Sequence, residues 1–471
     1  TGTTIASTWA NNTMNDLASA MTDSVAADGQ TAMTGNLNLN SNKIVNVADP
    51  TLAQDAATKN YSDTTYLAKA SNLSDVANAT TARTNISAAK SGANSDITSL
   101  TGLTTPLSQA QGGTGTTTGY YGFKNRIING AMVIDQRNAG ASVTPTGNSY
   151  TLDRWQAVTN VSSKFSVQQN AGSVTPPVGF SNYLGVTSLA STSLAATDYY
   201  TITQYIEGYN IADLNWGTAN AKTITLSFWV RSSLTGTFGG ALENNGQSRS
   251  YPFTYTISSA NTWEQKSLTI AGDTSGTWNT TNSTGISVWF GLGVGTTYSG
   301  TAGAWAGATL LSATGATSVV GVSGATLFLT GVQLEVGSTA TSFDYRPYGT
   351  ELALCQRYFC KTFTITTAPV ANTQNSGALM GKGNCASDIE PFCTWQTPVE
   401  MRTTPTVTLY AISNSVSANN QWTSGAAIAT ANARAGGIGV GTRQIQIDNT
   451  GNLSGSAGTQ FYIQAAASAE L

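Results

Sequence analysis

Apolar residues recur at every second position between Tyr120 and about Gly349. The segments KTITLSFWVRS (222–232) and GISVWFGLGVG (285–295) are the clearest examples. Successive side chains of a strand point to opposite faces, so this period indicates strands that bury one face. The apolar faces hold Ile224, Leu226, Phe228 and Val230 in the first segment, and Ile286, Val288, Phe290, Leu292 and Val294 in the second. Many such segments, separated by Gly-, Asn- and Ser-rich turns, predict a β-sandwich.

Two further regions of the sequence indicate β-structure. The segment ATLFLTGVQLEV (325–336) changes phase near Thr330–Gly331, as a β-bulge would. After ELALCQRYFCKTF, Pro405 at a strand start and the Gly-rich AGGIGVGTRQIQI hairpin predict a second, smaller β domain.

The composition excludes several kinds of site. Charged residues make up 10% of the chain, against about 25% in ordinary globular proteins. The net charge of −3 argues against a nucleic-acid binder, which needs a basic footprint. Because histidine is absent, His-based triads and His-ligated metals are excluded, and we expect no cofactor and no metal. No signal peptide and no run of about 20 apolar residues is present, so we expect no membrane insertion.

The remaining candidates for catalysis are carboxylates. A polysaccharide-cleaving enzyme needs two of them flanking a sugar bond. No two of those in the predicted sandwich form a catalytic signature, so we expect that the chain is not an enzyme. They are Glu207, Asp213, Glu243, Glu264, Asp273, Glu335 and Asp344.

Four cysteines, at 355, 360, 385 and 393, lack the paired short spacing of a zinc site. They are either buried free thiols or partly paired in a disulfide.

The first third of the chain is thin in apolar residues. A narrow stripe, Met14, Leu17, Met21 and Val25, predicts a helix over 8–27. A hairpin with a Ser-Asn turn is predicted over 33–49, and a helix that begins at Pro50 after an Asp49 cap. None of these pieces buries enough apolar area to offset its chain entropy alone, which favours three copies wound round one axis. The alternative is a disordered Thr/Ser-rich linker.

Several strings, taken in order, resemble one protein family. A repeat-like stretch comes first, TGNLNLNSNKIVNVADPTLAQDAATKNYSD. It is followed by QGGTG, NRIINGAMVIDQRNAG and YTLDRW, and later by LTGVQLEVGSTATSFDYRPYGTEL and CQRYF. Together they resemble bacteriophage tail fibre, or receptor-binding, proteins. The resemblance implies a mainly β, elongated trimeric fibre with short N-terminal helices and hairpin repeats, a jelly-roll β-sandwich and a small C-terminal β domain.

Four segments follow from that resemblance. They are an N-terminal helical attachment segment (1–32), a trimeric shaft with short repeats that ends in the Gly112–Gly119 linker (33–119), a carbohydrate-binding-module-like jelly-roll head (120–350) and a β tip domain (351–471). Arg357 in CQRYF is expected to anchor the connection between head and tip.

Aromatic residues are the candidates for ligand contact, because sugar rings stack on Trp and Tyr. Trp229 and Trp289 fall on the non-core faces of their strands, although a second layer or a trimer neighbour would cover such a face. Trp422 lies in the polar stretch SANNQWTSG beside Asn420, and Arg434 and Arg443 flank the Gly-rich hairpin. We expect these six residues to bind glycan.

The expected function is that of a homotrimeric phage tail fibre in the virion, made in the host cytoplasm, that recognises a host cell-surface glycan and mediates adsorption. Its partners would be a tail or baseplate protein at the N-terminal segment and a host surface polysaccharide or lipopolysaccharide. Alternatives are a fibre with polysaccharide depolymerase activity and a purely structural tail or collar fibre.

Overall fold

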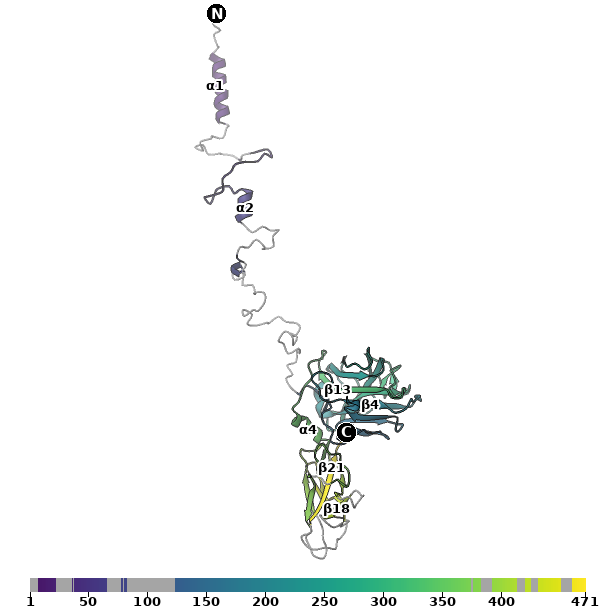
Figure 1. Cartoon of the computed structure of the whole chain (residues 1–471). Helices are drawn as coiled ribbons and strands as arrows, with labels where there is room; N and C mark the ends of the chain where they lie inside the picture. The colour runs from purple at the N-terminus through teal and green to yellow at the C-terminus, as the bar shows by residue number, and fades with distance from the viewer. Residues whose placement is uncertain are drawn as a thin grey trace. The chain divides into compact units, whose positions relative to one another are not determined.

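The computed structural model describes most of the chain beyond residue 122 and parts of the chain before it (Figure 1). The described residues are 7–22, 36, 38–65, 78, 80–82, 123–373, 376–382, 392–412, 420–424, 431–449 and 460–471. Two compact units are present, Thr1–Leu103 and Thr104–Leu471. The predicted Gly112–Gly119 linker lies outside the described residues. Among the residues that are described, no helix is long and apolar enough to cross a membrane.

The first unit contains the helices α1 (Ser7–Thr22) and α2 (Lys59–Thr65), and the described residues 80–82 are also helical. α1 matches the helix predicted over 8–27 as far as Thr22. The helix predicted from Pro50 is wrong, because α2 begins nine residues later. One carboxylate oxygen of Asp55 accepts the N–H groups of Thr51 and Leu52, at 2.7 and 2.8 Å, and so holds a turn there. Thr58 Oγ1 then accepts the Tyr61 N–H at 3.0 Å, as a helix N-cap does.

The predicted hairpin is present as a turn only. Asn40 and Ser41 have φ values of 44° and 65°, and the Asn42 N–H donates to Leu39 O at 2.8 Å. Two positive φ values in a row are typical of a type I′ hairpin turn. The turn is one residue earlier than predicted, and the described residues beside it form no strand.

Two antiparallel sheets form a sandwich in the second unit. The six-stranded sheet contains β1 (Ser149–Leu152), β2 (Trp155–Thr159), β5 (Tyr199–Glu207), β7 (Gly236–Asn244), β8 (Ser250–Ile257) and β10 (Thr284–Val294), in the order β1-β2-β5-β10-β7-β8. The five-stranded sheet contains β3 (Phe165–Gln169), β4 (Leu184–Ser188), β6 (Ile224–Ser232), β9 (Glu264–Ile270) and β13 (Thr326–Val336), in the order β3-β4-β13-β6-β9. Short connecting elements are β11 (Ser299–Gly300), β12 (Ser312–Ala313) and the 3₁₀ helices η3 (Ala171–Ser173), η4 (Gly208–Asn210) and η5 (Ala212–Leu214).

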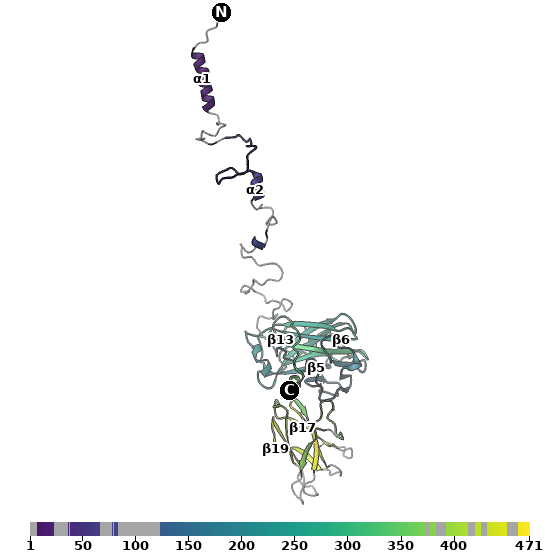
Figure 2. The ribbon, with the colours of Figure 1, turned by 60° about the vertical axis from the view of Figure 1, so that its left-hand side comes forward.

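The sandwich core lies between these two sheets, and Figure 2 shows β6 and β13 in one layer and β5 in the other. The rings of Phe228 in β6 and Phe290 in β10 meet edge to face, with centroids 5.1 Å apart. The apolar face predicted for 222–232 is buried, as is that of the segment 285–295 except at Val294, which is partly buried. The bulge predicted near Thr330–Gly331 is confirmed, since the β13–β6 register shifts between Thr330 and Gln333 and Gly331 has a φ of +60°. The prediction of a mainly β chain with a β-sandwich is therefore confirmed.

A second β assembly follows α4 (Tyr348–Gln356). It comprises β14 (Phe359–Lys361), β15 (Leu379–Lys382), β16 (Cys393–Gln396), β17 (Thr406–Tyr410), β18 (Gln421–Ser424), β19 (Ala431–Val440), β20 (Gln444–Asn449) and β21 (Gln460–Ser468). We call it the C-terminal sheet. Its order is β14-β21-β18-β19-β20-β16, and β15 and β17 also pair with β21. Cys355, Cys360 and Cys393 are buried free thiols, whereas Cys385 lies outside the described residues.

Buried polar groups join the sandwich to the C-terminal sheet. Glu470, just after β21, forms ion pairs with Arg137, at 2.6 Å, and with Arg154. Lys361 Nζ donates to the carbonyls of Gln136, Ile365 and Thr367 at 2.6–3.1 Å. Because burial opposes its charge, the pKa of Lys361 is lowered to about 8.

Candidate functional site

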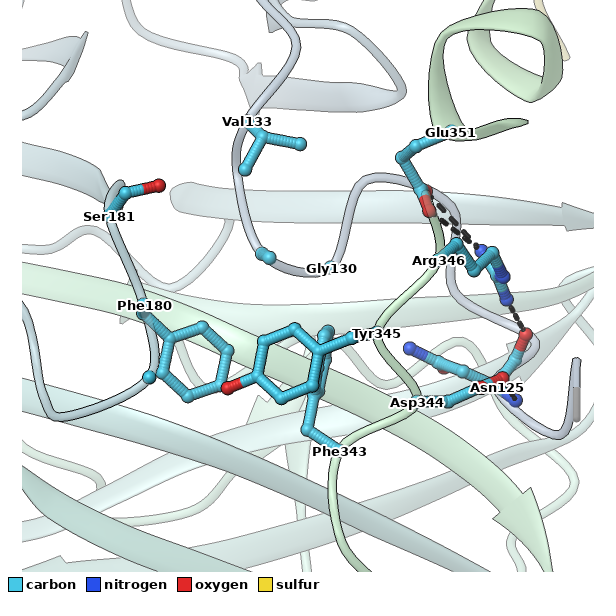
Figure 3. Close-up of a pocket in the computed structure, with 12 residues that line it drawn as sticks. Asn125, Gly130, Val133, Phe180, Ser181, Phe343, Asp344, Tyr345, Arg346 and Glu351 are labelled. Atoms are coloured by element: carbon cyan, nitrogen blue, oxygen red, sulfur yellow. Dashed lines mark hydrogen bonds and ion pairs between the residues drawn. The ribbon is translucent and has the colours of Figure 1, made fainter. Parts of the chain in front are cut away.

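A cavity of about 130 Å³ opens beside the bulge of β13 (Figure 3). Three stretches of chain line it: the loop between Asn125 and Val133, the loop 179–181 before β4, and the segment 343–346 with Glu351 of α4. In Figure 3 the rings of Phe180 and Tyr345 lie on one side of this cavity, and the pair Arg346–Glu351 lies on another. The cavity therefore has an aromatic wall and a charged wall.

The aromatic wall consists of Phe180, Phe343 and Tyr345. Their ring centroids are 4.9–5.5 Å apart, and each ring contacts the other two. Such tilted and edge-to-face contacts stabilise one another, so the wall is largely preformed. Tyr345 is nevertheless 57% exposed, which leaves ring surface available to a ligand.

Two glycines allow this wall to form. An ideal Cβ at Gly179, whose φ is +93°, would lie 2.6 Å from the Tyr345 hydroxyl oxygen. A Cβ at Gly130 would lie 2.2 Å from Val332 O, because the Gly130 carbonyl accepts the Val332 N–H at 3.0 Å and holds the loop against the bulge. Only glycine permits these approaches, and they set the two sides of the cavity.

The charged wall is held by backbone groups. Arg346 NH1 lies 3.3 Å from both carboxylate oxygens of Glu351 and donates to Ile127 O at 3.1 Å, while NH2 donates to Asn125 O. The Arg346 side chain is only 5% exposed, yet its Nε has no hydrogen-bond partner. Asp344 Oδ2 accepts the Asn125 N–H at 3.2 Å. The wall thus holds a buried ion pair and a half-buried carboxylate beside the rings.

Of the predicted site residues, Trp229 packs against the bulge of β13 beside this cavity. It is half-buried and pairs across the sheet with Thr330. A Cβ at Gly331 would lie 2.6 Å from Phe180 Cζ and 3.1 Å from Trp229 Cδ1, so both rings pack against the bulge. Glycan binding by Trp229 stays a prediction.

Trp289 is not the exposed platform that the strand alternation predicted. It is 3% exposed, and its ring meets that of Tyr205 edge to face at 5.8 Å. Val158, Ala241 and Leu311 bury it further. Other residues of the same chain therefore cover this face of the strand at Trp289, which is the alternative to an exposed platform.

Trp422 is also buried, although it lies in a polar stretch and was expected to contact glycan. It lies in β18, packs in the core of the C-terminal sheet, and donates from Nε1 to Asp448 O at 3.2 Å. Asn420 and Arg443 are exposed, and Arg434 lies in β19, although its side chain lies outside the described residues. The roles proposed for Asn420, Arg434 and Arg443 stay predictions.

The carboxylates of the sandwich divide into two groups. Those with structural partners are Glu207 with Arg357, Asp213 with Arg126, Glu264 with Lys266, Asp273 with Arg249, Glu335 with Thr341, and Asp344 with the Asn125 amide. Glu243 differs: it is buried, and its Oε1 has no hydrogen-bond partner.

Burial raises the pKa of Glu243 to about 7, and the adjacent Trp289 indole offsets part of that rise. The indole Nε1 itself has no partner of standard hydrogen-bond geometry. Glu243 is thus a buried carboxyl that is only partly ionised at neutral pH.

Sequence reasoning missed the aromatic wall. Phe180 stands in a loop without periodic apolar residues, some 160 positions before Phe343 and Tyr345. The one available signal was the aromatic pair in SFDYRP, next to an arginine and an aspartate.

No protein-family model and no curated protein matches the chain. Solved structures similar to it include the enzymatically active domain of tailspike protein 4 of bacteriophage CBA120, at 13% identity and a TM-score of 0.27, over 45% of this chain and 22% of that one. The carbohydrate-binding module TmCBM61, in complex with β-1,4-galactotriose, has 10% identity and a TM-score of 0.24, over 45% and 99%. A family 11 carbohydrate-binding module from Clostridium thermocellum, in complex with a β-1,3-1,4-mixed-linked tetrasaccharide, has 9% identity and a TM-score of 0.22, over 42% and 98%.

These likenesses are of low identity and low TM-score, and none identifies the family of this chain. The chain spans less than a quarter of the tailspike domain. The expectation that the chain is not an enzyme is contradicted by the presence of an enzymatically active domain among these structures, and it is withdrawn.

Proposed function

We propose that this chain is a bacteriophage tail fibre protein that binds a host cell-surface glycan through its sandwich. The observation that carries the proposal is the cavity with rings on one wall and polar groups on the other. Sugars present apolar C–H faces and a rim of hydroxyls, so their binding sites combine aromatic stacking with a few fixed donors and acceptors. Phe180 and Tyr345 supply the rings, and Asp344 supplies an acceptor beside the Arg346–Glu351 ion pair.

The order of fibre-like strings along the chain supports the viral assignment. In this proposal the N-terminal segment attaches to a tail or baseplate protein, and the protein acts in the virion during adsorption. The cell-surface partner is a polysaccharide or lipopolysaccharide of the host.

A trimer is the assembly we propose. Apolar side chains of the first unit are exposed in the single chain, among them Met14 at 67%, Ile44 at 64% and Leu52 at 74%. Exposed apolar groups on a chain with so little core gain stability when identical chains cover them. Three weak glycan sites on one assembly would also raise avidity by about 10²-fold or more.

Two measurements test the proposal. Light scattering of the full chain should give three times the monomer mass, and a monomer would contradict the trimer. Binding of the full chain to purified host polysaccharides, measured by biolayer interferometry, should be lost in Tyr345→Ala and retained in Tyr209→Ala. Tyr209 is a suitable control because it is exposed and lies outside the cavity. A chain that binds no polysaccharide of a susceptible host, and does not block adsorption, would contradict glycan recognition.

A further inference from the structure

We infer that the cavity beside the β13 bulge takes a single, uncharged sugar ring at the end of a glycan chain. This inference rests on the proposed function and narrows the class of ligand. It is carried by the size of the cavity, by the closure of one end and by the charges of its wall.

The size limits the ligand to one ring. The cavity volume is about 130 Å³. Sites for larger organic ligands are about 300–1,000 Å³. The cavity is therefore small for several sugar rings, and we infer that it takes one pyranose ring, lying partly over the exposed ring of Tyr345.

Because one end of the cavity is closed, we expect it to hold the terminal sugar of a glycan. Glu351, Arg346 and the Asn125 backbone are joined by hydrogen bonds and ion pairs across the side opposite Phe180 (Figure 3). Gly130 seals the cavity against β13, because its carbonyl accepts the Val332 N–H. An internal residue of a glycan would need a path for the chain on both sides. A terminal residue needs only one.

The charges select against acidic sugars. Arg346 is already paired with Glu351, so the second carboxylate, Asp344, leaves a net negative wall. A sugar carboxylate placed there would meet a like charge in a partly buried site, which is unfavourable. Hydroxyl groups instead find an acceptor in the half-buried carboxylate of Asp344.

The test uses the full chain and small probes. Methyl glycosides of glucose, galactose, mannose and N-acetylglucosamine are compared with methyl glucuronide by saturation-transfer NMR, and as competitors of host polysaccharide. We expect at least one neutral glycoside to bind and to compete. Its affinity should fall at least tenfold in Tyr345→Ala and remain within twofold in Tyr209→Ala. Removal of the terminal sugars of the polysaccharide with an exoglycosidase should abolish binding.

The charge is tested separately with Asp344→Asn, which preserves shape. This variant should bind the neutral glycoside more weakly than the parent chain does. Its affinity for methyl glucuronide, relative to its affinity for the neutral glycoside, should rise. Thermal unfolding of each variant, with a midpoint near that of the parent chain, verifies that it folds.

The outcomes separate the two claims. If polysaccharide binds but no monosaccharide competes and trimming has no effect, the terminal-ring inference is overturned while glycan recognition stands. Preferential binding of methyl glucuronide overturns the selection for uncharged sugars. If no glycan binds at all, the proposed function itself fails.

Discussion

Arg357 and Glu207 form a two-point ion pair between the end of α4 and the end of β5. Arg357 NH2 and Nε donate to the two carboxylate oxygens of Glu207 at 2.6 and 3.0 Å, and the Tyr358 hydroxyl donates to Glu207 at 2.6 Å. Glu207 belongs to the sandwich, and Arg357 leads into the C-terminal sheet. The expectation that Arg357 anchors this connection agrees with that position.

Loss of the cation should destabilise the connection, because Glu207 would remain buried with one partner, Tyr358. We expect Arg357→Met to lower the free energy of unfolding by about 2–4 kcal/mol. Lys266→Met is the matched control, since the Lys266–Glu264 pair has the same 2.6 Å separation but both side chains are partly exposed. It should cost no more than about 1 kcal/mol. Urea unfolding measures the stability of both variants. Equal losses would contradict the larger contribution expected of the Arg357–Glu207 pair.

The buried carboxyl of Glu243 predicts a pH dependence of stability. Its pKa in the folded chain is about 7, above the ordinary value of 4.5, so the folded state holds its proton more tightly than the unfolded state. Stability from this group is complete below pH 4.5 and is lost as the pH rises through 7. Glu243→Gln should therefore match the parent chain near pH 5 and exceed it by about 2–3 kcal/mol at pH 8.

Denaturant midpoints at the two pH values check this prediction. Glu264→Gln is the control, because Glu264 is solvent-accessible and paired with Lys266. A Glu243→Gln variant whose advantage does not change between pH 5 and pH 8 would show that Glu243 titrates normally.

Gly130 should not tolerate a methyl group. Because a Cβ there would lie 2.2 Å from Val332 O, Gly130→Ala must shift the loop away from the bulge. We expect a loss of about 1–3 kcal/mol and weaker glycan binding. Gly147→Ala, where a Cβ meets nothing within 4 Å and φ is not positive, should leave both unchanged. Calorimetry and binding to host polysaccharide measure the two effects; if the two variants behave alike, the cavity does not depend on this contact.

Trp422 should act through stability, not through contact with a ligand. Trp422→Ala removes a fully buried ring from the C-terminal sheet, and we expect a cost of about 3–5 kcal/mol. Hydrogen exchange of the β18 and β21 amides should accelerate accordingly. The exposed Arg443, changed to Ala, should leave exchange unaltered. A Trp422→Ala variant with native exchange rates and lost glycan binding would restore the surface role first expected for it.

Local patterns were sufficient for β6, β10 and β13 of the sandwich. Alternation at Ile224, Leu226, Phe228 and Val230 identified the buried face of β6, and the phase change at Thr330–Gly331 identified the bulge. The buried face and the bulge both follow from the alternation of side chains along a single strand, so residues close in sequence are enough to predict them.

Burial of the tryptophans could not be read from such patterns. Trp289 is covered by Tyr205 and Leu311, and Trp422 by residues of β20 and β21, all of them distant in sequence. The aromatic wall has the same origin, since Phe180 meets Tyr345 only after β4, β6 and β13 have paired. The start of α2 was missed for a local reason: Asp55 accepts the N–H groups of Thr51 and Leu52, which Asp49 would have accepted as the cap of a helix beginning at Pro50.

The C-terminal sheet is fastened to the sandwich at both of its ends. Arg357 forms an ion pair with Glu207 just before the first strand of the sheet. Arg137 and Arg154 form ion pairs with Glu470 just after its last strand. A pull on this sheet would therefore be shared between these two ion-pair sites and the hydrogen bond from Lys361 to the Gln136 carbonyl. Loss of either ion-pair site alone would therefore leave the sheet attached to the sandwich.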